Sequence, residues 1–451
     1  MESLSTIFKA YDVRGIYPTQ LNATTARRIG QAFASVRAPK KVAIGQDVRA
    51  SGGELKAALI EGLLVSGVDV VDIGVITTDQ LYFAVGNYGY DGGISVTASH
   101  NPSEYNGFKF SEKGGSPIGS DDLGALRDWA ASTSKPLGSK RGVVSSRELM
   151  DDYIAHVLSY IDPSTIRPMS VVANANFGAA GRGVDKIAGK LKLKLQRLNW
   201  EEDGTFPKGP PNPLLPENRD ETLQLVKDVG PDFGVAWDAD ADRVFFFTGE
   251  GVFVPSPFII ALLAPVFLQK YPKSKILHDL TTAWVIDDAI KQAGGIPVAN
   301  RTGHTFIKAR MRQEDAPFAG ESSGHYYFRD SFYADNGLVP FLMILEMVSK
   351  SGKSLGQLVG PLMEKYKLSG EINFTVENSA KILADIESKF AGTGDVDKTD
   401  GLVINNSDWR ISVRTSNTEP LLRLNAESKS QEKLDKIVAK ITKLIESQKQ
   451  L

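Results

Sequence analysis

The sequence of 451 residues contains no cysteine, and that absence excludes several kinds of chemistry. Disulfide bonds, thiolate nucleophiles, and zinc or iron–sulfur sites held by thiolates all need this side chain. A chain without cysteine suits a reducing compartment, so we expect a cytoplasmic protein.

The sequence also lacks a long hydrophobic run and an excess of charge of either sign. The longest apolar run, residues 258–268, contains Pro265 and is too short to cross a bilayer, so we expect a buried helix there. The first residues lack the basic and then apolar segments of a secretory signal. With 52 basic and 54 acidic residues the formal net charge is −2, which argues against a nucleic acid or a membrane surface as partner. Recognition therefore has to come from local groups of residues.

Three segments of the chain share one layout, in which an apolar strand is followed by a polar or glycine-containing turn and then by residues with helical spacing. The strands that open them are expected at residues 41–45, 170–172 and 275–277. Strands that alternate with helices predict parallel βαβ units.

The last part of the chain has a different pattern. Alternating strands are predicted at 372–375 and 409–413, followed by a closing helix whose apolar stripe runs from Leu434 to Ile445. This pattern is typical of a smaller α+β domain. We expect domain boundaries near residues 145, 250 and 367.

Residues 97–102, with the sequence Thr-Ala-Ser-His-Asn-Pro, directly follow the apolar segment 93–96. A turn at the end of a strand can hold the Ser99 hydroxyl exposed, as a nucleophile, beside charged neighbours. Adjacent side chains point apart, so we do not expect His100 to act directly on Ser99 as a general base. Taken alone, the segment is equally compatible with a solvated loop.

A second motif, Asp-Ala-Asp-Ala-Asp-Arg at 238–243, follows the apolar run 233–237. Carboxylates at alternate positions of an extended loop can converge on one side, and three of them suit a hard cation such as Mg²⁺. An acidic turn at a hairpin tip is the alternative. A phosphate on Ser99 would add a charge of about −1.5 to −2, which the aspartates would repel unless a divalent cation lay between them. A phosphoserine and a metal would therefore explain each other.

Two further loops carry groups that can bind a sugar phosphate. Gly-Glu-Ser-Ser-Gly-His at 320–325 offers hydrogen-bonding partners for neighbouring sugar hydroxyls, and Arg-Thr-Ser-Asn-Thr-Glu-Pro at 414–420 suits a phosphate dianion. A flexible loop and an ordinary capped turn are the alternatives.

In this order the motifs resemble those of the α-D-phosphohexomutase superfamily, and within it the bacterial phosphomannomutase/phosphoglucomutase group. Tyr-Asp-Val-Arg-Gly at 11–15 and Asn-Gly-Phe-Lys at 106–109 support the match, which extends over nearly the whole chain. The resemblance implies an α/β fold of three related mixed-sheet α/β domains plus a smaller C-terminal α+β domain, arranged around one cleft. The implied domains carry the phosphoserine, metal, sugar-specificity and phosphate-binding loops in turn: 1–144, 145–249, 250–366 and 367–451.

The resemblance also implies a role for each matching residue. Ser99 would be the phosphorylated nucleophile, and Mg²⁺ would be held by Ser99 with Asp238, Asp240 and Asp242. The transferring group would be surrounded by His100, Lys109 and Arg243, with Lys109 as candidate general acid or base.

Substrate binding would use residues of other loops. The sugar 3- and 4-hydroxyls would contact Glu321 and Ser323. The phosphate that does not react would be bound by a larger group: Arg414, Ser416, Asn417 and Thr418, with Tyr11, Arg14, Arg301, His304 and His325.

The implied reaction moves one phosphoryl group from phosphoserine to a hexose 1-phosphate or 6-phosphate. The resulting hexose 1,6-bisphosphate turns end for end and returns its other phosphate to Ser99. Glucose and mannose share the 3- and 4-hydroxyls, so we expect both to serve. The expected partners are small sugar phosphates, and the expected assembly is a monomer or a weak homodimer.

Two departures from the family pattern leave alternatives open. Gln46 stands where relatives commonly have arginine, and Ser322 stands where dual-specificity enzymes often have methionine and phosphoglucosamine mutases glutamine. Phosphoglucosamine mutase is therefore an alternative on the same fold. A phosphatase with Asp238 as nucleophile is another, and a sugar-phosphate sensor that binds without turnover is a third.

Overall fold

The computed structural model describes residues 4–132, 140–415 and 421–447. The chain divides into two compact units, and each of them is formed from two separate stretches of sequence. Unit 1 comprises residues 1–253 and 324–355, and unit 2 comprises residues 254–323 and 356–451.

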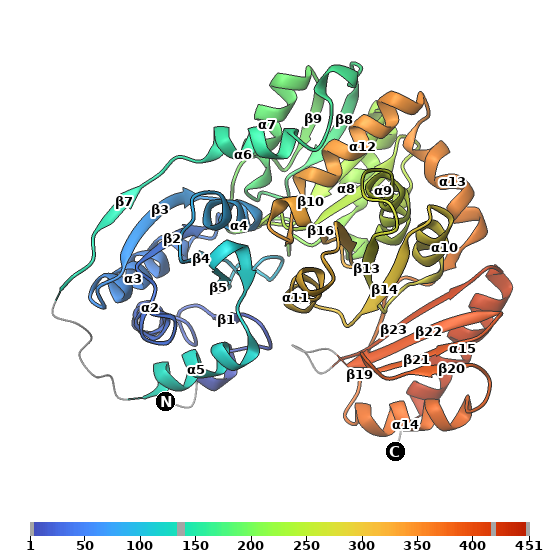
Figure 1. Ribbon diagram of the computed structural model, residues 1–451. Helices are drawn as coiled ribbons and strands as arrows, with labels where there is room; N and C mark the ends of the chain where they lie inside the picture. Colours follow the sequence, from blue (N-terminus) through green and yellow to red (C-terminus); the bar gives the residue numbers. More distant parts are fainter. Residues whose placement is uncertain (1–3, 133–139, 416–420, 448–451) are drawn as a thin grey trace. The chain divides into compact units, whose positions relative to one another are not determined.

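Unit 1 begins with a mixed sheet. In spatial order its strands are β1 (Val13–Ile16), β5 (Tyr105–Glu112), β4 (Gly92–Val96), β2 (Lys41–Gln46), β3 (Asp69–Val75) and β7 (Val144–Ser146), with β6 (Ser116–Pro117) paired to β5. β2 runs parallel to β3 and β4, whereas β5 is antiparallel to β4. The helices of this part are α1 (Leu4–Ile7), α2 (Ala23–Arg37), α3 (Gly52–Leu64), α4 (Thr78–Asn87) and α5 (Ser120–Ala131). The apolar faces of α2, α3 and α5 form one core with the sheet, and α2 lies beside α3 (Figure 1).

A second mixed sheet completes unit 1. Its strands, in order, are β12 (Phe253–Val254), β11 (Val244–Thr248), β10 (Phe233–Trp237), β8 (Ser170–Asn174) and β9 (Lys194–Leu198). Its helices are α6 (Met150–Leu158), α7 (Ala180–Leu191) and α8 (Asp220–Val229). The returning segment adds the hairpin β16 (Tyr326–Phe328) and β17 (Ala334–Asp335) and the helix α12 (Leu338–Ser351), which packs on α6 and β11.

Unit 2 combines a parallel and an antiparallel arrangement. The parallel strands are β14 (Ile296–Asn300), β13 (Lys275–Asp279) and β15 (Phe318–Gly320), and their helices are α9 (Ser256–Lys270), α10 (Trp284–Gln292) and α11 (His304–Glu314). The antiparallel sheet has the order β18 (Lys367–Leu368), β23 (Leu421–Ser428), β22 (Trp409–Thr415), β21 (Leu402–Asn405) and β20 (Asp395–Asp397), with β19 (Ile372–Thr375) also paired to β23. Helices α14 (Ser379–Lys389) and α15 (Gln431–Ser447) share a core with this sheet, and α13 (Leu355–Lys365) precedes it in the chain. The short 3₁₀ turns of the two units are η1 (Lys113–Gly115), η2 (Pro163–Thr165), η3 (Pro216–Asn218) and η4 (Arg329–Ser331).

The predicted secondary structure is confirmed at the strands that open the three α/β segments and in the closing helix, which buries Leu434, Ile437, Ile441 and Ile445. The apolar run 258–268 lies within α9, as expected. The fold class is confirmed, whereas the exact domain boundaries stay predictions. No helix among the described residues is both long and apolar enough to span a membrane.

Candidate active site

Ser99 lies in the turn that follows β4, and its backbone is left-handed, with φ of 49°. Residues other than glycine adopt this conformation uncommonly, and mostly where surrounding contacts hold them in it. One such contact is the Thr97 hydroxyl, which accepts a hydrogen bond from the Ser99 amide at 2.9 Å. Ser99 is only 2 % exposed, and its hydroxyl donates to Asp238 Oδ2 at 2.9 Å. The expectation of an exposed hydroxyl was wrong, because the aspartate turn encloses it.

His100 lies directly beside the nucleophile, with Nδ1 3.2 Å from Ser99 Oγ. The expectation that these two side chains point apart was wrong, because the left-handed backbone at Ser99 turns them toward the same side. Arg243 Nη2 also hydrogen-bonds to His100 Nδ1. Since a guanidinium can only donate, His100 Nδ1 accepts in this contact.

Asp238, Asp240 and Asp242 lie on the connection between the antiparallel strands β10 and β11. Their carboxylates converge, with one oxygen of each within 4.8 Å of those of the other two. The connection is not the extended loop that we expected, because Ala241 has a left-handed φ of 54° and folds the chain into a turn. A solvated hairpin tip is excluded as well, since the three aspartates are 0, 0 and 3 % exposed.

Two cations lie against these carboxylates. Lys109 Nζ, on β5, donates to Asp240 Oδ2 at 2.8 Å and also to Asp242. Arg243 Nε donates to Asp238 Oδ2 at 2.9 Å. Three carboxylates therefore face two cationic side chains, and the cluster keeps an excess of negative charge.

Burial and charge move the pKa values of this cluster in opposite directions. Burial raises the pKa of Asp238 well above its ordinary value, and the charges of Asp242 and Asp240 add to the shift. Burial also acts to raise the pKa of Asp242, but the charges of Lys109 and His325 outweigh it and hold that pKa well below its usual range. For Lys109, burial acts to lower the pKa, yet Asp240 and Asp242 raise it overall. Lys109 is therefore a persistent cation at neutral pH.

The residues of the aspartate turn fit a divalent metal ion. Asp240 Oδ1 and Asp242 Oδ1 are buried, and within the described residues they accept no hydrogen bond. A buried carboxylate oxygen without a donor is costly, and a cation between the side chains would satisfy both atoms. A donor set made of oxygen atoms suits a hard cation such as Mg²⁺ or Ca²⁺.

Other residues of unit 1 singled out in the sequence lie around this centre. Arg14 on β1 braces the nucleophile turn, because its guanidinium donates to Asn101 Oδ1 and, at 2.8 Å, to Asp12. Tyr11, close by in the chain, is half-buried. His325 Nε2 lies 3.6 Å from Asp242 Oδ1, so the structure brings His325 to the aspartate turn, where the resemblance implied a contact with the second phosphate.

The loop expected to bind the sugar lies in unit 2, directly after β15. Glu321 is 1 % exposed, and its Oε1 accepts a hydrogen bond from the Gly303 amide at 2.8 Å. Ser322 donates from its amide and its hydroxyl to Asp279, at 2.6 and 3.0 Å. Ser323 is half-buried. The hydroxyl of Ser322 is thus committed to the protein itself.

The residues expected to bind the second phosphate are described only in part. Arg414, at the end of β22, is 9 % exposed, with Nη2 3.4 Å from Glu371 Oε2. Arg301 lies over the ring of Phe306 at 3.9 Å, and His304 begins α11. Ser416, Asn417 and Thr418 lie outside the described residues.

Several polar residues around the nucleophile were not singled out as site residues from the sequence. Thr78 donates to Asp240 Oδ2 at 2.5 Å, and the Thr97 hydroxyl lies 2.7 Å from Asp47 Oδ2. Arg49 is buried and donates to the carbonyl of Ser99 at 2.7 Å. The signal that could have revealed Arg49 is the charged pair in Gly-Gln-Asp-Val-Arg at 45–49, directly after an apolar strand.

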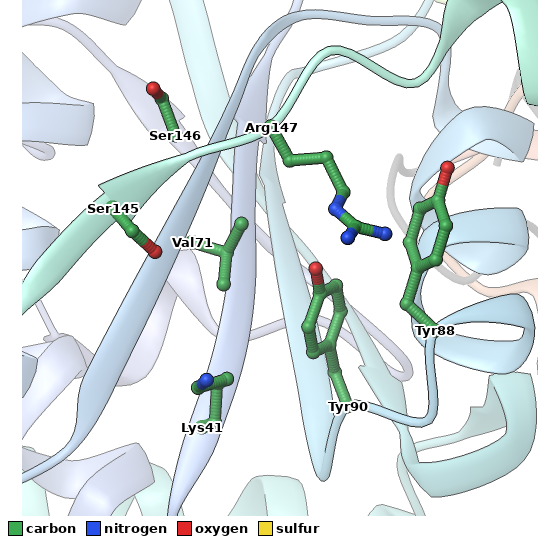
Figure 2. A pocket seen from close by; sticks show the side chains of 7 residues that line it. All are labelled: Lys41, Val71, Tyr88, Tyr90, Ser145, Ser146 and Arg147. Atoms are coloured by element: carbon green, nitrogen blue, oxygen red, sulfur yellow. The ribbon is translucent and has the colours of Figure 1, made fainter.

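The structure also has a shallow hollow of about 320 Å³ in unit 1, at the edge strand β7 (Figure 2). The Arg147 guanidinium lies there over the ring of Tyr88, at 4.0 Å. The remaining lining residues are Lys41, Val71, Tyr90, Ser145 and Ser146. None of these residues belongs to the predicted site, so the hollow and the nucleophile are separate features.

Comparison with known proteins gives a consistent result along the chain. Four family models match it in succession, and each describes a domain of phosphoglucomutase/phosphomannomutase. They are alpha/beta/alpha domain I at residues 5–136, domain II at 151–251, domain III at 256–366 and the C-terminal domain at 371–444.

Individual proteins are similar over almost the full length. A protein of Xanthomonas campestris pv. campestris described as "Phosphohexose mutases" is 45 % identical over 424 residues, which cover 94 % of this chain and 95 % of that protein. A phosphomannomutase of Salmonella montevideo is 45 % identical over 435 residues, with the same two coverages. The crystal structure of a phosphoglucomutase/phosphomannomutase family protein from Burkholderia thailandensis matches with a TM-score of 0.88 at 31 % identity and covers 98 % of each chain.

Proposed function

Because this chain belongs to the phosphoglucomutase/phosphomannomutase family of the α-D-phosphohexomutase superfamily, and is thus an isomerase, we propose that it interconverts the 1-phosphates and 6-phosphates of mannose and glucose. The observation that carries the proposal is the buried contact of 2.9 Å between Ser99 Oγ and Asp238 Oδ2, with Lys109 and Arg243 bound to the same aspartate turn. It joins a nucleophile, a candidate metal site and two cations in one place.

In the proposed reaction Ser99 carries the phosphoryl group. The P–O bond to Ser99 breaks while the free hydroxyl of a hexose phosphate forms a new P–O bond and loses its proton. The hexose 1,6-bisphosphate formed in this way then reorients, and its other phosphate returns to Ser99. Phosphoryl transfer depends mainly on positioning and on stabilising the charge of the transferring group.

The cations around Ser99 can supply that stabilisation. Arg243 Nη2 lies 3.4 Å from Ser99 Oγ, so its guanidinium can contact a phosphate held there. The raised pKa of Lys109, against burial that acts to lower it, comes from Asp240 and Asp242 and keeps the ammonium protonated. We therefore assign Lys109 to charge stabilisation, and to proton donation rather than proton abstraction.

We propose that Mg²⁺ is held by Asp238, Asp240 and Asp242 together with the oxygen atoms of Ser99 or its phosphate. The buried Oδ1 atoms of Asp240 and Asp242, which lack hydrogen-bond donors among the described residues, support this assignment. When bound, the ion would neutralise the phosphate and polarise its oxygen atoms.

Substrate binding is assigned to the loops of unit 2, with residues of unit 1 at the phosphates. Glu321 and Ser323 would bind the sugar hydroxyls. The phosphate that does not react would be bound by Arg414, Ser416, Asn417 and Thr418, with Tyr11, Arg14, Arg301, His304 and His325. These assignments rest on the resemblance of the motifs, as do the domain boundaries 1–144, 145–249, 250–366 and 367–451.

The sugar is the least constrained part of the proposal. Relatives called phosphomannomutase at 44 to 45 % identity favour mannose phosphates. The alternative is phosphoglucosamine mutase. A coupled assay that compares the 1-phosphates of mannose, glucose and glucosamine decides between them, and a preference for glucosamine 1-phosphate would contradict the proposed specificity.

We expect Ser99→Ala to lower kcat by several orders of magnitude while the affinity for the sugar phosphate stays close to that of the wild type. The substitution removes the covalent step and leaves the binding loops intact. A suitable control is Ser111→Ala, since Ser111 is equally buried, on β5, and its hydroxyl reaches only the Glu112 carbonyl at 3.4 Å.

Labelling then identifies the nucleophile. Protein treated with ³²P-labelled glucose 1,6-bisphosphate is digested and mapped by mass spectrometry, and the label is expected on Ser99. Label on Asp238 would support the phosphatase instead. Binding of hexose phosphates without any turnover would support the sensor.

A further inference from the structure

We propose that Arg49 is a positioning residue for phosphoryl transfer, because its guanidinium holds the turn that carries Ser99 in the conformation that directs the hydroxyl at Asp238. The inference deepens the proposed function and rests on it. Arg49 lies in the segment 45–49, in which the family's usual first arginine is replaced by Gln46.

Arg49 binds the nucleophile turn through its backbone. Its two terminal nitrogens donate to four carbonyl oxygens, those of Ser99 at 2.7 Å, Asn101 at 2.6 Å, Pro102 at 2.6 Å and Tyr105 at 2.9 Å. Its Nε donates to Asp47 Oδ2 at 3.2 Å. All five N–H groups of the guanidinium thus have an acceptor, and no other side chain offers so many donors in one plane.

These contacts matter because carbonyl oxygens repel one another when they converge. The side chain of Arg49 is fully buried, so water does not separate the four carbonyl dipoles. A permanent cation at their centre turns the repulsion into attraction. The residues from Ser99 to Tyr105 therefore depend on the guanidinium for their shape.

The same arginine acts on the other side of Ser99 through Asp47. Asp47 Oδ2 lies 2.7 Å from the Thr97 hydroxyl, and that hydroxyl accepts the hydrogen bond from the Ser99 amide. Both peptide groups that flank the Ser99 Cα atom are thus tied to the Arg49–Asp47 pair. This pins the left-handed backbone at Ser99, and with it the direction of the hydroxyl.

A segment of the second sheet's domain closes over the arginine from the other side. The ring of Phe206 lies 4.9 Å from Arg49 Cζ, and a side chain at Gly204 would collide with the Val48 carbonyl, 2.3 Å from an added Cβ atom. Arg49 touches neither the Ser99 hydroxyl nor a carboxylate of the aspartate turn. Its effect on the reaction is therefore indirect.

The first experiment compares Arg49→Lys with a matched control, Arg219→Lys. Arg219 also donates to two backbone carbonyls, those of Pro213 and Leu214, and lies over the Phe253 ring at 3.5 Å, but it makes no contact with the nucleophile turn. With mannose 1-phosphate as substrate and glucose 1,6-bisphosphate as activator, we expect Arg49→Lys to lose about 100-fold in kcat, the cost of misplacing a reacting group by about 1 Å. KM should stay within about threefold, since the binding loops are unchanged. Arg219→Lys should keep both constants.

A second measurement separates positioning from general loosening of the fold. Guanidinium ion at non-denaturing concentration should restore part of kcat in Arg49→Ala and leave Arg219→Ala unchanged. Asp47→Asn should lower kcat in the same direction as Arg49→Lys, by a smaller factor, and it tests the proposal if the arginine variants do not fold.

The outcomes are distinct. If the wild type turns over and Arg49→Lys keeps its kcat, or if both arginine variants lose kcat in parallel with their melting temperatures, the inference is wrong. If the wild type turns over no hexose phosphate at all, the proposed function fails, whatever the variants do.

Discussion

At the scale of single residues, the chemistry depends on carboxylates whose neighbours fix their orientation. Thr78, at the start of α4, binds Asp240 twice: its amide donates to the Asp240 carbonyl at 2.9 Å and its hydroxyl to Oδ2 at 2.5 Å. Lys109 binds the same oxygen. The remaining oxygen, Oδ1, is left for a metal ion.

We expect Thr78→Val to weaken Mg²⁺ binding about 10- to 100-fold, because groups that orient a metal ligand typically contribute that much to affinity. Mg²⁺ titrated against activity, or calorimetry, measures the change. Thr222→Val is the control, because Thr222 is 1 % exposed and hydrogen-bonded to Asn174 at 2.9 Å, and neither residue belongs to the aspartate turn. An unchanged Mg²⁺ affinity in Thr78→Val would contradict the role given to this hydroxyl.

The residues that carry the chemistry differ in how far the sequence predicts them. The nucleophile and the three aspartates stand in motifs, so Ser99 and the aspartate turn were predicted directly. The roles of Thr78 and Arg49 were not, because a threonine after a strand or an arginine in a loop has the same local signature wherever its side chain goes. Only the contacts to Asp240 and to the carbonyl of Ser99 distinguish them.

At the scale of elements, two helices of the first domain approach closely through glycine. A Cβ atom added at Gly62 on α3 would lie 2.1 Å from the Arg27 carbonyl, and one at Gly30 on α2 would lie 2.4 Å from the Leu59 carbonyl. The backbones therefore touch where the helices cross, and no side chain fits between them.

Gly62→Ala is expected to lower the free energy of unfolding by about 1–3 kcal/mol, since the added methyl group forces the helices apart. Gly189→Ala is the control: Gly189 lies inside α7 with no atom within 4 Å of an added Cβ, and alanine there should stabilise the protein by about 0.5–1 kcal/mol. Urea denaturation measures both. Equal effects of the two substitutions would show that helix crossing is not the cause.

The first turn of α4 holds a buried acid whose ionisation opposes folding. Burial raises the pKa of Asp79 to about 7, although the hydroxyls of Thr77 and Tyr153 donate to its carboxylate and act in the opposite direction. The folded protein therefore keeps a proton on Asp79 at pH values where the unfolded chain has lost it.

This predicts that stability attributable to Asp79 falls as the pH rises from about 4 to about 7 and is constant above that range. Asp79→Asn removes the titration, so its stability relative to the wild type should increase between pH 5 and pH 8, by at most a few kcal/mol, at about 1.4 kcal/mol per pKa unit. Thermal or urea unfolding at the two pH values measures the difference. A difference that does not change with pH would contradict the prediction.

Whole-element predictions succeeded where a periodic pattern decides the structure. The helix α15 follows from the spacing of Leu434, Ile437, Ile441 and Ile445, and β10 follows from an uninterrupted apolar run. The turn after β10 was predicted less well, as an extended loop. Its conformation depends on the left-handed Ala241, which no periodicity indicates.

At the scale of the whole molecule, the chain forms two compact units, and the nucleophile and the aspartate turn lie in the same one. The chain returns to unit 1 with residues 324–355, and this return brings His325 to Asp242. The transfer centre is therefore complete within one unit. The predictions of a cytoplasmic location and of a monomer or weak homodimer stay open to experiment.

Metal removal should affect activity and stability together. We expect EDTA to abolish turnover and added Mg²⁺ to restore it, because a phosphate on Ser99 would otherwise face three carboxylates. At a Mg²⁺ concentration about 100 times its Kd, the bound ion should add about 2.7 kcal/mol to the free energy of unfolding. Differential scanning calorimetry with and without Mg²⁺ measures this, and Asp238→Asn should lose most of the response. Full activity after rigorous chelation would contradict the metal assignment.

The sequence by itself determined the order of the elements, the fold class and the identity of the nucleophile and the acidic residues, because periodicity and residue type act locally along the chain. Only the tertiary structure decided that Ser99 is buried, that His100 lies beside it, and that Arg49 and Thr78 hold the reacting groups. These facts depend on contacts between segments that lie 50 to 162 positions apart, and the energy of such contacts has no signature in the local sequence.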